Sequence, residues 1–209
     1  MATDITPIVL TAGLTTIGTF FITRYTHGLN LSRESQARED EWKRRASYLA
    51  ARVVCVLDPF VMACCDVVGD NGIYDPKGVR HIQVSTPTLE LPQDVDWKSI
   101  SPALMYRILA LPNQIEAAEK AVSWVGSELA FPPDYDEAYD ERCYQYARLG
   151  LTAFDLAAEL REMFGLPDQD YGKWNPRSYL EGSSKEEFER RETAGVALSV
   201  AQSIKDQSA

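Results

Sequence analysis

Residues 5–23 carry no charge, and this uncharged run between Asp4 and Arg24 constrains the chain more than any other feature. As an α-helix its nineteen residues measure about 28 Å, close to the roughly 30 Å hydrocarbon core of a bilayer. Six threonines and two glycines dilute its hydrophobicity, which places it near the threshold for a membrane span. We expect a transmembrane helix over residues 1–24, with a core helix of a soluble protein as the alternative. Without basic residues ahead of the run or a small-residue cleavage pattern after it, a cleavable signal is not expected.

Basic residues follow the uncharged run, and none precedes it. The membrane-proximal basic residues are Arg24, Arg33, Arg38, Lys43, Arg44 and Arg45. The positive-inside rule then predicts a single-pass membrane protein whose C-terminal body is cytoplasmic. The run Lys43–Arg45 is a candidate contact for anionic lipid headgroups. Its alternative is a solvated helix face with ion pairs to the acidic residues 39–41.

Threonines recur every four residues in the uncharged run, which places their hydroxyls on one ridge of a helix. The residues that we predict to mediate helix association are Thr11, Thr15, Gly18 and Thr19. Small and hydroxylated ridges allow helices in a bilayer to approach closely and to hydrogen-bond across the contact. Alternatively, each threonine bonds back to the carbonyl four residues earlier and needs no partner.

The remaining chain predicts long helices, because apolar residues recur every three or four positions over residues 32–68, 101–131 and 134–164. Pro59 is expected to kink or break the first of these helices, and Pro112 to interrupt the second. Asp134 and Glu137 form a capping box for the third, which ends at Gly165. The predicted fold is all-α, with the transmembrane helix followed by an elongated antiparallel bundle of three to four long helices. Its domains are residues 1–24, the bundle over 25–166, and a loop with a C-terminal helix over 167–209.

Residues 70–100 are rich in Pro, Gly, Asp and Thr and show no helical period, so we expect an irregular excursion with at most a short strand. Long loops are often functional, which makes this segment a candidate binding surface. The alternative is a strap that lies across the bundle, held by Leu89, Leu91 and Trp97.

Composition and motifs argue against several kinds of chemistry. The formal net charge of -10 disfavours nucleic acid as a partner. The four cysteines lie in apolar helical patterns, and Cys64 is expected in the core rather than in a metal or catalytic site. His27 and His81, the two histidines, lie in no metal motif. The acidic residues 134–141 are explained by the dipole of the helix they open, so no metal, cofactor or catalytic residue is predicted.

These features lead to a non-enzymatic, membrane-anchored interaction or scaffold protein that self-associates or binds another membrane protein. Its partners would be membrane lipid and a second copy or another membrane protein. Two alternatives stay open. In the first alternative, the chain is a soluble helical ligand-binding protein or enzyme, with a pocket near the proline kinks. Otherwise, its threonine-lined helices assemble into an oligomeric pore.

Overall fold

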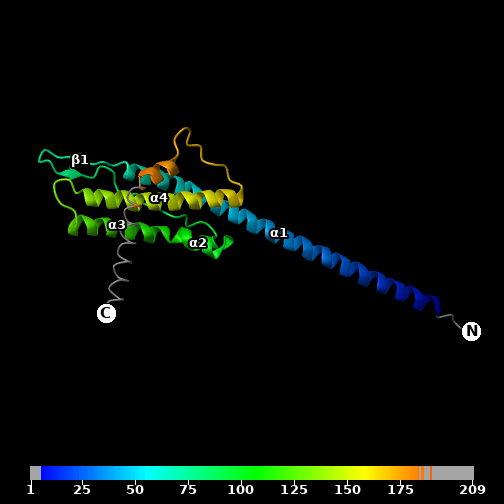
Figure 1. Cartoon of the computed structure of the whole chain (residues 1–209). Coiled ribbons are helices and arrows are strands. Elements are labelled where there is room, and N and C mark those ends of the chain that lie inside the picture. Colours follow the sequence, from blue (N-terminus) through cyan, green and yellow to red (C-terminus); the bar gives the residue numbers. More distant parts are fainter. Residues whose placement is uncertain (1–5, 184, 186–188, 190–209) are drawn as a thin grey trace, which may run out of the picture. The chain divides into compact units, whose positions relative to one another are not determined.

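The chain is mainly helical, which confirms the predicted all-α class at this level. The computed structural model describes the backbone of residues 6–183, 185 and 189, and the side chains within this range from residue 33 onward. Figure 1 shows its main helices, which are α1 (Thr6–Val68), α2 (Pro102–Leu109), α3 (Leu111–Glu128) and α4 (Asp136–Phe164). A short 3-10 helix, η1 (Trp97–Ser99), and two strands, β1 (Ile73–Tyr74) and β2 (Arg80–His81), complete the fold.

Two compact units make up the chain, Met1–Arg45 and Ala46–Ala209. In the first unit, the helical side chains of residues 33–45 are all exposed. In the second unit, α3 and α4 pack side by side, and residues 46–68 of α1 lie along α4. The core residues that the structure describes begin at Ala46 and include Leu57, Leu104 and Leu156, each at most 2 % exposed.

The C-terminal part of α1 follows the predicted apolar stripe and ends, as expected, before Gly69. Leu49, Leu57 and Val61 are fully buried on this stripe. The helix α1 continues through Pro59, so the break that we expected there is confined to the hydrogen-bond ladder. Proline removes one backbone hydrogen bond, and the burial of the flanking Leu57 and Phe60 compensates for that loss.

The second predicted helix begins and divides as its prolines indicate. Ser101 caps α2 by accepting a hydrogen bond from the Leu104 amide, at 3.3 Å, and Pro102 occupies the first turn. The helix ends at Leu109, and α3 starts at Leu111 with Pro112 in its own first turn. Pro112 therefore divides the predicted helix in two.

The predicted capping box of α4 does not form. The residue before this helix is Tyr135, in a left-handed conformation with φ 56°, and it makes no side-chain cap. Asp134 instead accepts a hydrogen bond from the Tyr74 hydroxyl, at 2.8 Å. A tertiary partner thus takes the oxygen that the local pattern assigned to the helix.

The excursion between α1 and α2 is largely irregular, as predicted. Its strands β1 and β2 pair antiparallel, with Ile73 opposite His81, in a hairpin that the sequence patterns did not indicate. Residues 82–96, which we call the strap, then run to η1. Leu89, Leu91 and Trp97 are partly buried against the core, which matches the strap interpretation. Arg52 fastens the strap to α1 by an ion pair with Asp94, at 2.7 Å.

Residues 176–183 form a helix inside the segment that we expected to be a loop up to residue 184. Asn175 accepts a hydrogen bond from the Ser178 amide, at 3.2 Å, and Pro176 follows as the first helical residue. This pair is a capping signal that outweighed the polar composition of the segment. The helix inserts Leu180, which is fully buried, against Gly150 of α4.

Replacing Gly150 with alanine is expected to destabilise the second unit. The added Cβ would lie 2.7 Å from Cδ1 of Leu180 and 3.0 Å from Cβ of Cys64, closer than packed atoms tolerate. Overpacking of this kind costs about 1–3 kcal/mol, more than the roughly 1 kcal/mol that alanine gains over glycine in a helix. Urea unfolding measures the difference, with Gly182→Ala as the control, because a Cβ there meets nothing within 4 Å. Equal stability of the two variants would contradict the close packing at Gly150.

Candidate functional site

Asp70 is the centre of the hydrogen bonding at the end of α1. Its Oδ1 accepts a bond from the Gly72 amide, at 2.9 Å, as expected for a turn residue. Its Oδ2 accepts bonds from the amides of Gln83, at 3.0 Å, and Val84, at 2.9 Å. One carboxylate therefore joins the end of α1 to the start of the strap.

Arg142 of α4 completes this arrangement. Its Nη1 lies 3.0 Å from Oδ2 of Asp70, and its Nη2 donates to the carbonyl oxygen of Val84, at 2.5 Å. The two charged side chains are 5 % and 2 % exposed. A buried charge is costly unless it is paired and hydrogen-bonded, and here both conditions hold. We call these two residues, with the amides that they bind, the Asp70–Arg142 pair.

The surroundings of Asp70 favour its ionised form. Burial by itself would raise the pKa of the carboxyl group. The three backbone amides and the Arg142 guanidinium outweigh burial and hold the pKa of Asp70 below its usual value. The carboxylate therefore stays charged wherever the fold is intact near neutral pH.

Arg80 and Tyr139 pack beside the pair. The Arg80 guanidinium lies 3.7 Å from the centroid of the Tyr139 ring and forms an ion pair with Asp136, at 2.8 Å. Burial raises the pKa of Tyr139. Gly72, with φ +66°, permits this approach, because a Cβ at that position would overlap the Tyr139 hydroxyl. A cavity of about 400 Å³ opens here, lined mainly by apolar atoms.

A second half-buried pair joins α1 to α4. Nη2 of Arg161 lies 2.5 Å from Oδ2 of Asp58, and its Nε donates to the carbonyl oxygen of Pro167, at 3.0 Å. The guanidinium thereby fixes the chain as it leaves α4. The two arginines therefore act as structural cross-links, and neither presents an unpaired cation to solvent.

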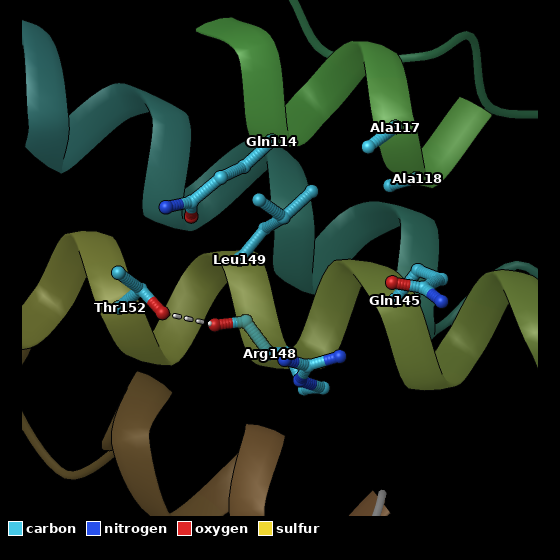
Figure 2. A pocket seen from close by; sticks show the side chains of 7 residues that line it. All are labelled: Gln114, Ala117, Ala118, Gln145, Arg148, Leu149 and Thr152. Carbon is cyan, nitrogen blue, oxygen red and sulfur yellow. Dashed lines mark hydrogen bonds between the residues drawn. The ribbon is translucent and has the colours of Figure 1, made fainter. Parts of the chain in front are cut away.

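Figure 2 shows a shallow groove of about 500 Å³ between α3 and α4. Gln114, Ala117 and Ala118 line it from α3, and Gln145, Arg148, Leu149 and Thr152 line it from α4. The Thr152 hydroxyl donates to the carbonyl oxygen of Arg148, at 2.8 Å, within its own helix. The groove holds no nucleophile with a neighbouring base.

The adjacent thiols of Cys64 and Cys65 are poorly suited to catalysis. Cys64 is fully buried, which confirms the expectation that it belongs to the core. Burial raises the pKa of Cys64 strongly and that of Cys65 to about 11, so both thiols stay protonated near neutral pH. His81 lies 3.1 Å from Asp75 in the hairpin. Within the described residues, no group of three or more His, Cys, Asp or Glu side chains is arranged to hold a metal ion.

The four residues that we predicted to mediate helix association belong to α1, and the structure describes their backbone but not their side chains. They are Thr11, Thr15, Gly18 and Thr19. Arg24 is likewise described by its backbone alone. The other predicted basic residues, from Arg33 to Arg45, are exposed on α1. Lys43 pairs with Glu39, at 3.1 Å, and Arg45 with Glu41, at 2.5 Å, each one turn earlier. The structure does not bring these basic residues together with any cavity, and their contact with lipid stays a prediction.

The sequence patterns did not predict the ion pair between Asp70 and Arg142. A signal was present, because Arg142 lies four residues before Tyr146 and Arg161 four after Ala157, both on the apolar stripe of α4. An arginine at a core position needs a buried acid, and Asp58, Asp66 and Asp70 are the acids that the packed part of α1 and its end supply. The spacing alone did not tell which acid pairs with which arginine.

No protein-family model, curated protein or solved structure matches the chain. Among the helices whose residues the structure describes in full, none is long and apolar enough to cross a membrane. The predicted span over residues 5–23 lies outside those residues.

Replacing Asp70 with asparagine is expected to lower the free energy of unfolding by about 3–5 kcal/mol at pH 7, because it leaves Arg142 buried without a counter-charge. The folded-state pKa of Asp70 is depressed, so its contribution is complete above the unfolded value of 3.8 and is lost as the pH falls through the folded value. The difference in free energy of unfolding between the parent chain and the Asp70→Asn variant should therefore narrow below about pH 4.

Urea unfolding between pH 7 and pH 3 measures this difference. Asp155→Asn is the matched control, because Asp155 pairs with Arg177 in an ion pair that is about half exposed. Such a pair contributes at most about 1 kcal/mol. If Asp70→Asn lowers the free energy of unfolding by no more than the control does, the buried pair is not important for stability.

Proposed function

We propose that this chain is a membrane-anchored helical protein, whose anchor is residues 5–23 and whose body is a cytoplasmic interaction module built as a bundle of three to four helices. The proposed body is not an enzyme. The observation that carries the proposal is the exposed stretch of residues 33–45, which follows the uncharged run in the chain and ends where the described core begins. The described core draws on no residue before Ala46, and residues 33–45 between run and core are exposed.

This exposed stretch supports an anchor over a core helix. A core helix of a soluble bundle would pack its neighbouring turns against the rest of the core. The thirteen residues 33–45 contribute no buried side chain, while the next residue, Ala46, is fully buried. An uncharged run of nineteen residues that lies beyond such a solvated stretch needs an apolar environment of its own, which a bilayer offers.

The charges of the solvated stretch fit an orientation with the body on the cytoplasmic side. Arg33, Arg38 and Arg44 are exposed, and the last two donate from Nε only to backbone carbonyls one turn earlier, at 3.3 Å. Lys43 and Arg45 are partly neutralised by Glu39 and Glu41. Attraction to anionic lipid would therefore come mainly from the three arginines.

Self-association is the second part of the proposal, and it belongs to the ridge of Thr11, Thr15, Gly18 and Thr19. The exposed stretch offers little for it, because residues 33–45 contain two apolar residues, Ala37 and Trp42, and no heptad seam. Contacts between copies would then be confined to the run itself, or would involve another membrane protein with a similar small-residue ridge.

A soluble ligand-binding protein is the second candidate function, and the groove between α3 and α4 is the observation that favours it (Figure 2). Gln114, Gln145 and Arg148 contribute polar groups to its lining, beside the small side chains of Ala117 and Ala118. This candidate does not need the uncharged run to enter a membrane, so cell fractionation separates the two.

The full-length chain is expected to pellet with membranes, to resist a high-salt wash, and to be released by detergent. A version that starts at Arg24 should stay in the supernatant with the same thermal unfolding as the detergent-released chain, because the exposed residues 33–45 of the remaining chain pack no side chain into the core. Release of the full-length chain by salt alone would show that attachment is electrostatic. Solubility of both versions would favour the second candidate.

Thr15→Cys is expected to yield a disulfide-linked dimer in membranes under mild oxidation, in a background in which the exposed Cys55 is serine. Ser35→Cys, on the exposed stretch, is the control and should cross-link at least fivefold less. Non-reducing gel electrophoresis measures both. Equal cross-linking of the two positions would place the contact outside the ridge, and absence of any cross-link would contradict self-association.

A further inference from the structure

A cavity of about 570 Å³ lies beside the end of α1 and shares Val84 with the surroundings of the Asp70–Arg142 pair. Its lining includes Met62, Cys65, Asp66 and Gly69 near the end of α1, and Trp174 and Tyr179 from the segment after α4. Met62 is 37 % exposed and Trp174 is 40 % exposed, although both are large apolar side chains. The cavity is therefore open to solvent and bordered by apolar surface.

Two aromatic rings form a fixed corner in this cavity. The centroids of Trp174 and Tyr179 are 5.8 Å apart, and the ring planes are inclined at 47°. Tyr171 holds Trp174 from another side in an edge-on contact, with centroids 6.5 Å apart. The faces of aromatic rings carry negative partial charge, so a corner of two rings attracts a cation that is itself weakly hydrated.

Asp66 adds a full negative charge to the same cavity. Its side chain is exposed, and within the described part of the chain no ion pair or side-chain hydrogen bond involves its carboxylate. No lysine or arginine lines the cavity, and the nearby Arg177 is already paired with Asp155 and Glu181. The cavity therefore combines two aromatic rings, a thioether and one unneutralised carboxylate.

We propose that the corner formed by Asp66, Trp174 and Tyr179 binds a quaternary ammonium group. Such a cation carries methyl groups that pack on Met62 and on the rings. It has no N–H groups to satisfy, so the few polar atoms of the lining are sufficient. This site belongs to the second unit and is independent of the proposed anchor.

Choline is the probe that tests the site, added as its chloride to the full-length chain in maltoside micelles, with sodium chloride at matched ionic strength as the reference. The indole N–H signals of the four tryptophans report where it binds. Only the signal of Trp174 is expected to move, while those of Trp42, Trp97 and Trp124 stay in place. Trp174→Leu identifies the signal and should weaken binding about tenfold or more.

The Asp66→Asn substitution is expected to lower the affinity for choline about threefold to fivefold, which is the range of a partly exposed charge interaction. Trp124→Leu and Asp40→Asn, at exposed positions elsewhere, are the matched controls and should leave the affinity unchanged. The neutral isostere 3,3-dimethyl-1-butanol should bind at least tenfold more weakly than choline. Phosphocholine separates the possible sources: equal affinity indicates a lipid headgroup, and weaker binding, through repulsion of phosphate by Asp66, indicates a free cation.

Three results would overturn the proposal. The first is that choline chloride moves the Trp174 signal no further than sodium chloride does at the same ionic strength. The second is that the neutral isostere binds as tightly as choline, which would show that the cavity recognises apolar surface and not positive charge. The third is that the Asp66→Asn and Trp174→Leu variants bind choline with the affinity of the parent chain, while their thermal unfolding also matches that of the parent.

Discussion

The buried pair of Asp70 and Arg142 is the interaction on which the second unit depends. One carboxylate receives three backbone amides and a guanidinium, and the guanidinium also binds the carbonyl of Val84. The end of α1, the start of the strap and α4 therefore share one electrostatic centre. Apolar packing alone is non-directional and would leave their relative positions less well defined. The pair supplies direction, at the cost of desolvating two charges.

Much of the helical order could be predicted from the chain, because it rests on local rules. The stripe of α1, the Ser101–Pro102 start and the break at Pro112 all follow from spacing, capping and the missing amide of proline. The errors share one cause, which is a partner distant in sequence. Asp134 bonds to Tyr74 instead of its own helix, and the helix at residues 176–183 docks through Leu180 into the space at Gly150.

The candidate sites were less predictable than the fold. Arg142 was recognisable as a charge on an apolar stripe, but its acid could be chosen only once α1 and α4 were placed side by side. The corner of Trp174, Tyr179 and Asp66 joins residues more than a hundred positions apart, and no local motif marks it. Composition did narrow the range of partners, since a net charge of -10 disfavours nucleic acid.

The ion pairs that hold α1 to α4 connect residues 72 and 103 positions apart. A ribosome adds roughly 5–20 residues per second, so the acid Asp58 precedes Arg161 by roughly 5–20 s of synthesis. During that interval the apolar stripe of α1, with Leu49, Leu57 and Val61, has no α4 to cover it. The nascent chain therefore presents a hydrophobic helix before its partner exists, and exposed apolar surface of this kind is prone to aggregate until it is covered.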